Sequence, residues 1–296
     1  MPATRQTEAG LRLCHSWLLQ DTCGGASHPP AEILFRYKNN PSPCDQGVHP
    51  HPSKRDRQRY ASYPEAKEYV LSDVSFNIEA GQTIGIIGQT GSAKTTLVSL
   101  IPRLYDATKG TVRIDGIDVK KYPMRHLRDA IAVVLQKNTL FSGSLLSNLY
   151  WGNENASMEE INEACHIACV DEFLDRLPQG YDTDMGQGGV NVSGGQKQRI
   201  CIARAILKKP KVLILDDSTS AVDTATEGKI RDGLAKKLPD MTKIVIAQRI
   251  SSVKHADQII ILDRGKVAAI GTHETLLANN RIYQEIYESQ KEGVDL

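Results

Sequence analysis

The stretch GQTGSAKTT, residues 88 to 96, decides how this chain folds. It follows QTIGIIG, an apolar run of strand length, and it opens the helix-like run KTTLVSLIPRLYD. A glycine-rich turn between a strand and a helix aims backbone N–H groups and the helix N-terminus at one point, where they can hold phosphate groups. The residues predicted to cradle a nucleotide are Gly88, Gln89, Thr90, Gly91, Ser92, Ala93, Lys94, Thr95 and Thr96.

Two side chains of this loop carry specific predictions. Lys94 is expected to reach the β- and γ-phosphates, and the Thr95 hydroxyl to bind Mg²⁺. Ala93 departs from the usual pattern, which has glycine at its place. Its methyl group is harmless at negative φ but costs about 1–2 kcal/mol if the backbone is left-handed. We therefore expect altered nucleotide binding, not its loss. The alternative is a plain glycine turn with a solvent-facing lysine.

A second stretch, KVLILDDSTSAVD, spans residues 211 to 223. Four apolar residues run into two adjacent carboxylates, which is typical of a buried strand that ends at a metal-nucleotide site. Asp216 is expected to hold Mg²⁺ and Asp217 to face an attacking water. An acidic strand end is common in α/β proteins, so this signal gains its weight from the phosphate loop about 120 residues earlier.

The order of the remaining signals predicts an α/β domain with a largely parallel sheet, because strand-like runs alternate with helical ones. The helical block from about 138 to 195 interrupts this alternation and is expected to be a subdomain. Within it Cys165 and Cys169 lie four residues apart, the spacing of two core-facing side chains on a helix.

Residues 1–59 differ in character from residues 60–290. They are rich in proline, histidine and cysteine and show no sustained period, so we assign them to no domain and expect disorder or loose structure. A zinc site is disfavoured because the spacings match no standard pattern. The residues concerned are Cys14, His15, Cys23, His28, Cys44, His49 and His51.

Composition narrows the possible partners and locations. The net charge of +1 gives no electrostatic reason to expect nucleic acid, and no run approaches the roughly 18 apolar residues of a membrane-spanning helix. The start of the chain lacks the pattern of a secretory signal. Six cysteines in 296 residues indicate reduced thiols in the cytoplasm, not a disulfide framework.

The stretch NVSGGQKQRICIARAILKKPKVLILDD, residues 191 to 217, resembles the signature motif of ABC transporter ATPase domains together with the strand that follows it. The resemblance covers residues from about 60 to 290. It implies a P-loop NTPase sheet core with an antiparallel β subdomain and an inserted α-helical subdomain, and it implies ATP and Mg²⁺ as ligands.

The same resemblance implies roles for further residues. Tyr63 would stack on adenine, Gln136 would join Mg²⁺ to the transmembrane partner, and Asp223 would be the acid of the loop that crosses a dimer interface. Family members pack head to tail, so the signature residues serve a nucleotide held mainly by the partner. These residues are Ser193, Gly194, Gly195 and Gln196.

Two departures fall on the catalytic step. The family usually has glutamate at position 217 and histidine at position 248, where this chain has Asp217 and Gln248. A base misplaced by about 1 Å can cost about 100-fold in rate, and a glutamine cannot carry charge. With Lys94 and Gln136 retained, this pairing resembles the degenerate-site subunit of heterodimeric multidrug exporters. Such a site holds ATP and turns it over slowly, while the intact VSGGQ supports the partner's site.

Three alternatives remain open. The chain could be a self-sufficient homodimeric ATPase with Asp217 as its base, a soluble ABC ATPase unconnected with transport, or an inert fragment. The exporter-like stretches LFSGSLLSNL and GTHETLLANNRIYQEIYESQ argue against the second. The expected partners are an exporter's transmembrane domain, absent from this chain, and a second ABC ATPase domain, at the cytoplasmic face of the membrane. The cargo cannot be read from this part.

Overall fold

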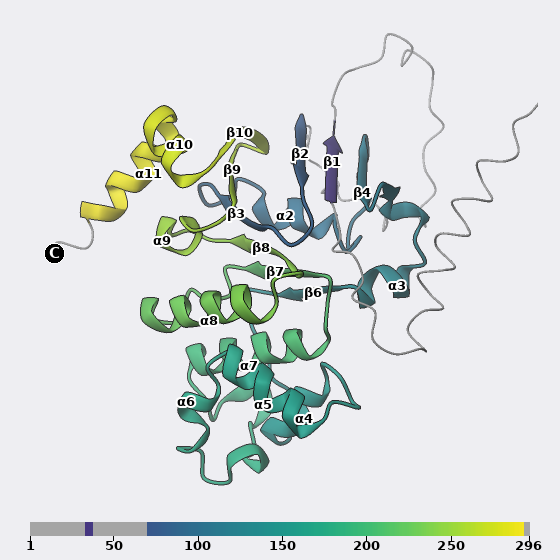
Figure 1. Ribbon diagram of the computed structural model, residues 1–296, viewed down its shortest axis with the longest axis vertical. Coiled ribbons are helices and arrows are strands. Elements are labelled where there is room, and N and C mark those ends of the chain that lie inside the picture. Colours follow the sequence, from purple (N-terminus) through teal and green to yellow (C-terminus); the bar gives the residue numbers. More distant parts are fainter. Residues whose placement is uncertain (1–32, 38–69, 293–296) are drawn as a thin grey trace, which may run out of the picture.

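The computed structural model describes residues 33–37 and 70–292, which form two sheets and a layer of helices (Figure 1). The larger sheet has six strands in the order β10-β9-β3-β8-β7-β6. Strands β3, β6, β7, β8 and β9 are parallel, and β10 pairs antiparallel with β9. These strands are β3 (Thr83–Ile87), β6 (Ile131–Val134), β7 (Val212–Asp216), β8 (Thr242–Ile246), β9 (Gln258–Asp263) and β10 (Lys266–Gly271). The predicted α/β class is confirmed.

The smaller sheet is antiparallel, with the order β2-β1-β4-β5. Its strands are β1 (Ile33–Tyr37), β2 (Val74–Ile78), β4 (Thr111–Ile114) and β5 (Ile117–Asp118). In β2 the exposed and buried positions alternate, because one face covers the core and the other meets solvent. This sheet is the expected antiparallel subdomain.

Strand β1 corrects the division of the chain at residue 60. Residues 33–37 were assigned to no domain, yet they pair with β2 on one side and with β4 on the other, and Ile33 is fully buried. The run ILFRY is too short to show a period, and its partners lie far along the chain. The strand is therefore specified by tertiary pairing that local pattern does not reveal. The zinc candidates of residues 1–59 lie outside the described residues.

Helices cover the larger sheet. Their bounds are α2 (Lys94–Ser99), α3 (Met124–Asp129), α4 (Leu145–Tyr150), α5 (Met158–Ile167), α6 (Asp171–Leu174), α7 (Gly194–Leu207), α8 (Thr224–Lys237), α9 (Ile250–Val253), α10 (His273–Asn279) and α11 (Arg281–Glu292). Helices α4 to α7 form the layer at the bottom of Figure 1, and α4 to α6 lie inside the block predicted as a helical subdomain. Among the described residues, no helix has the length and apolar character needed to cross a membrane.

Three apolar cores hold these layers together. One lies between the sheet and helices α4, α5, α7 and α8, and contains the buried, free cysteines Cys165, Cys169 and Cys201. Burial raises the pKa of the Cys165 and Cys169 thiols to about 11, so both stay protonated at neutral pH. The second core joins the two sheets to α2. The third lies beneath α9, α10 and α11.

Candidate functional site

The predicted site residues gather where parallel strands end. In a parallel sheet all carboxyl ends meet at one edge, which is where α/β proteins bind ligands. Strand β3 ends at the loop 88–93, β7 ends at Asp216, and β8 leads through Ala247 to Gln248. Strand β6 leads to Gln136 in the same way. Because β8 lies between β3 and β7, segment 247–249 sits between the phosphate loop and the acidic pair.

The phosphate loop closes tightly against its neighbours. A Cβ on Gly88 would lie 2.1 Å from the carbonyl oxygen of Leu262, so the loop requires glycine there. Ala93 has φ 73°, the left-handed conformation in which its methyl group is strained. Of the two cases left open for Ala93, the backbone shows the strained, left-handed one. No side chain caps helix α2, which leaves the first N–H groups of the helix for a ligand.

Lys94 lies over this loop. Its Nζ donates to the carbonyl oxygens of Gly88 at 2.7 Å and Gln89 at 3.0 Å. Burial lowers the pKa of Lys94, while the negative charges of Asp217 and Asp216 act to raise it. The ammonium therefore faces the same corner as both carboxylates, as a residue that neutralises phosphate charge requires.

The donor set fits Mg²⁺, which prefers oxygen ligands. Asp216 is 5% exposed, and the Thr95 side chain lies close enough to its carboxylate to act against the rise of its pKa. Burial raises the pKa of Asp216, with the nearby charge of Asp217 adding to the effect. A cation must find this carboxylate ionised, so Mg²⁺ binding is expected to weaken as the pH falls toward the raised pKa. That loss begins at a higher pH than for an ordinary aspartate.

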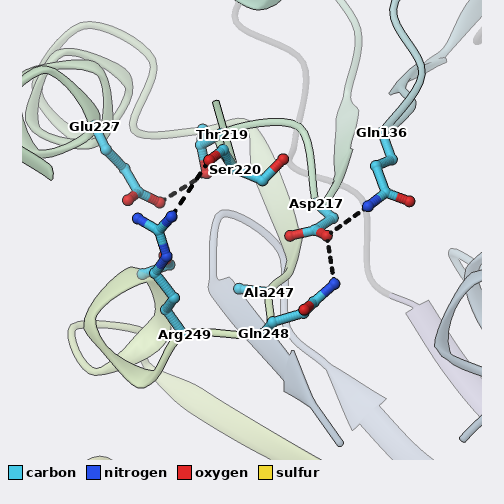
Figure 2. Close-up of a pocket in the computed structure, with 9 residues that line it drawn as sticks. Gln136, Asp217, Thr219, Ser220, Glu227, Ala247, Gln248 and Arg249 are labelled. Carbon is cyan, nitrogen blue, oxygen red and sulfur yellow. Dashed lines mark hydrogen bonds between the residues drawn. The ribbon is translucent and has the colours of Figure 1, made fainter. Parts of the chain in front are cut away.

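Two amides hold Asp217. Its Oδ2 accepts from Gln136 Nε2 at 3.0 Å and from Gln248 Nε2 at 2.8 Å (Figure 2). Its backbone is left-handed, with φ 48°, a conformation that aspartate tolerates better than most residues do. Three of the four residues predicted for the catalytic step, Gln136, Asp217 and Gln248, thus come from three different strand ends and meet at the Asp217 carboxylate. The fourth, Lys94, lies over the phosphate loop.

A cavity of about 300 Å³ adjoins Asp217. Three of its lining residues, Gln136, Asp217 and Gln248, are site candidates from the sequence. The sequence does not identify the other lining residues as site candidates: Thr219, Ser220, Glu227, Ala247, Arg249 and Ser252. Glu227 is buried in α8 and accepts from the Thr219 hydroxyl at 2.7 Å, as Figure 2 shows. Glu227 lies four residues after Asp223, one helical turn along α8, and this spacing is the sequence signal that could have pointed to Glu227.

Asp223 caps helix α8. Its carboxylate accepts from the backbone N–H of Thr226 at 2.9 Å, and that bond lowers the pKa of Asp223. An exposed acid at a helix start keeps its charge over most of the pH range. The loop 217–223 is therefore fixed at both ends. Its start is held by the hydrogen bonds to Asp217, and its end by the cap that Asp223 forms on α8.

The signature residues begin helix α7 and contact this loop instead of the phosphate loop. Ser193 and Gln196 form a reciprocal cap, in which each side chain accepts from the other's backbone N–H. A Cβ on Gly195 would lie 2.7 Å from the carbonyl oxygen of Ala221, whereas one on Gly194 would meet only ordinary contacts. Within residues 33–37 and 70–292, no hydrogen bond or ion pair links residues 193–196 to residues 88–96. Tyr63 lies outside the described residues.

Comparison with known proteins gives consistent results. The family described as "ABC transporter" matches residues 71–220. The uncharacterized ABC transporter ATP-binding protein YfiB of Bacillus subtilis is 47% identical over 228 residues, which cover 77% of this chain and 39% of that protein. The ATP-dependent lipid A-core flippase of Alkalilimnicola ehrlichii is 40% identical over 268 residues, covering 88% of this chain and 45% of the flippase.

A solved structure extends the likeness to three dimensions. The structure of a bacterial Atm1-family ABC exporter with ATP bound matches with a TM-score of 0.76 at 30% identity, over 96% of this chain and 48% of that one. The chain thus spans less than half the length of these relatives. The flippase alignment covers 88% of the chain, more than the roughly 80% that follows Tyr60, so it includes residues before position 60.

Proposed function

The chain belongs to the ABC transporter family as an exporter-type nucleotide-binding domain, and from that premise we propose that it binds ATP with Mg²⁺ and couples ATP binding and hydrolysis to transport across a membrane. The observation that carries the proposal is the meeting of Lys94, the Thr95–Asp216 pair and Asp217 at the carboxyl ends of β3 and β7, which lie on either side of β8. This is the set of groups that phosphoryl transfer needs: a phosphate cradle, a cation site and a carboxylate near the attacking water.

Each group has a distinct task. The loop 88–96 and Lys94 hold the phosphates, and Thr95, Asp216 and Gln136 would hold Mg²⁺. When bound there, Mg²⁺ supplies positive charge that stabilises the developing charge on the transferred phosphoryl group. Tyr63 is proposed to stack on the adenine base.

The proposed working unit contains two domains packed head to tail. Each nucleotide would lie between the phosphate loop of one domain and residues 193–196 of the other. The self-contained cap of Ser193 and Gln196, and their lack of hydrogen bonds to residues 88–96 in the described part of the chain, support a role at the partner's nucleotide. The domain would act at the cytoplasmic face of a membrane, through an exporter's transmembrane domain.

The site of this chain is proposed to be slow. Asp217 is one methylene shorter than glutamate, so its oxygens reach less far toward an attacking water, and its Oδ2 is already engaged as the acceptor of two amide hydrogen bonds. Gln248 donates to Asp217 and cannot supply the positive charge that a histidine could. Binding groups are thus retained and hydrolytic groups are weakened, which favours a different subunit as the partner.

A self-sufficient homodimer is the second candidate. It is favoured by the position of the Asp217 carboxylate, which lies within hydrogen-bond reach of both Gln136 and Gln248, where a base would be held. In that case Asp217 performs the proton transfer unaided, and the two copies have equivalent sites.

Single-turnover ATP hydrolysis separates the two candidates. The unaltered chain and the Asp217→Glu/Gln248→His double variant are compared at saturating ATP, with ATP affinity measured in the same samples. The slow-site proposal expects equal affinity and a rate about 100-fold higher in the double variant. Equal rates would establish Asp217 as a competent base and favour the homodimer. A chain that binds no ATP would contradict both candidates.

A further inference from the structure

Helix α11 contacts the segment beside Asp217, residues 248–250, through the side chain of Gln290. Its Nε2 donates to the backbone carbonyl of Gln248 at 2.8 Å, and its Oε1 accepts from the backbone N–H of Ile250 at 2.8 Å. One amide thus pairs with two backbone groups on either side of Arg249. The arrangement resembles the pairing of a neighbouring strand and fixes both the position and the rotation of segment 248–250.

The same segment is held from its other side by its own side chains. Gln248 donates to Asp217, and Arg249 donates through Nη2 to the carbonyl of Ser220 at 3.3 Å. Segment 248–250 is therefore a bridge. Its backbone is bound to helix α11, and its side chains are bound to the loop that follows strand β7.

The apolar contacts beneath α11 make this bridge stiff. Tyr283 is fully buried in the same apolar cluster as Ala247, which precedes segment 248–250, and Ile250, which ends it. The cluster also includes Ile87, which precedes the phosphate loop. The Tyr283 hydroxyl pairs with His273 Nδ1 at 2.8 Å, which ties α11 to α10. Figure 1 shows α11 beside α10, with α9 below them. A helix anchored in this way places the Gln290 amide with little freedom.

We propose that Gln290 is a positioning residue for the reaction, which holds the Gln248 amide against Asp217 by fixing the backbone of residues 248–250. The inference rests on the proposed ATPase function. It adds the C-terminal helix to the parts that govern turnover. Gln290 itself touches neither the nucleotide cradle nor Asp217 through any hydrogen bond of the described residues.

The first test measures hydrogen exchange of the backbone amides of residues 247–253, without nucleotide. Gln290→Ala is expected to speed exchange at Ile250 by about tenfold, because its N–H loses its acceptor. Gln284→Ala is the matched control, since Gln284 lies on the same helix but donates to Leu277 at 2.7 Å. Gln290→Glu keeps an acceptor for Ile250 and loses the donor to Gln248, so it should leave Ile250 protected. Equal exchange in Gln290→Ala and Gln284→Ala would overturn the proposal.

The second test is a double-mutant cycle on single-turnover hydrolysis. Gln290→Ala is expected to lower the single-turnover rate constant by about three- to tenfold, because the Gln248 amide is misplaced, while ATP affinity stays within about twofold, because the phosphate loop is untouched. In the Gln248→Ala background the same change should have less than about a twofold effect. Additive effects would show that Gln290 acts elsewhere. If the unaltered chain turns over too slowly, the cycle is run in Asp217→Glu; the exchange test needs no turnover and stands if the slow-site proposal fails.

Discussion

The start of α2 and the start of α7 both combine serine with glycine, but they are built in different ways. Helix α2 begins without a side-chain cap, after a strained left-handed Ala93. Helix α7 begins with a reciprocal cap between Ser193 and Gln196. Under the proposed function, the first start keeps its N–H groups for a phosphate held by this chain. The second already has its serine hydroxyl engaged, so a nucleotide held by a partner would have to share or replace that cap.

The two starts also differ in what their glycines contact. Gly88 packs against the Leu262 carbonyl near the end of strand β9, whereas Gly195 packs against Ala221 in the loop after β7. The α2 start is therefore fixed by the sheet, and the α7 start by a loop of the proposed dimer face. Substitutions at the two starts should have unequal effects on folding, and they test this difference.

The largest effect is expected from Gly88→Ala. Its Cβ would lie 2.1 Å from the Leu262 carbonyl, so backbone must move, and the free energy of unfolding should fall by about 3 kcal/mol with loss of ATP binding. Gly91→Ala is the control, because Gly91 has φ 83° and no atom lies near the position of its added Cβ. This variant should therefore lose only the free energy of holding alanine in a left-handed backbone conformation. Urea unfolding measures both; equal stabilities would contradict the sheet-fixed α2 start.

The next effect separates the two signature glycines. Gly195→Ala should lower the free energy of unfolding by about 2 kcal/mol, because its Cβ would press on the Ala221 carbonyl at 2.7 Å. Gly194→Ala meets only the Ala221 Cβ at 3.5 Å and should be neutral or slightly stabilising. Thermal and urea unfolding of the isolated chain provide the measurement. A Gly195→Ala variant as stable as Gly194→Ala would mean that this glycine is required only by a partner.

Removing the cap of α7 should have a smaller effect. Ser193→Ala deletes the acceptor of the Gln196 N–H and is expected to cost about 1 kcal/mol of stability. ATP affinity of the isolated chain should not change, because residues 88–96 are untouched. Ser193→Asp, which can still cap, is the control for stability. A loss of ATP affinity in Ser193→Ala alone would contradict the proposed in-trans role.

The smallest effect is expected at the start of α2. Ala93→Gly removes the backbone strain of a left-handed alanine, which should stabilise the folded state by about 1–2 kcal/mol. Glycine also raises the conformational entropy of the unfolded chain, which should lower stability by about 0.4–1 kcal/mol. The net gain in the free energy of unfolding should therefore lie between about 0 and 1.6 kcal/mol, with a midpoint near 0.8 kcal/mol. Unfolding and ATP affinity are measured together. Destabilisation by glycine would mean that Ala93 makes a compensating contact.

Much of the fold could be predicted from sequence, since the elements that surround the site are strongly patterned. The run VLILDD predicts a strand that is buried on both faces, and GQTGSAKTT predicts the turn that follows a second strand. The meeting of Gln136, Asp217 and Gln248 also depends on the order of the strands within the parallel sheet, which the alternation of strands and helices does not give. Local pattern could not reveal Gln290, because a glutamine on a helix carries no signal until its backbone partners are known.

Strand β1 has a practical consequence for any shortened form of this protein. It is an inner strand of its sheet, paired with β2 and β4 on its two sides. A chain that begins at Tyr60 would lack it, and the facing edges of β2 and β4 would lose their hydrogen-bonding partners. Such edges capture strands from other molecules. A shortened chain would therefore tend to exchange strands or aggregate. Low ATP binding or activity in such a sample would result from the missing strand and would say nothing about the nucleotide site.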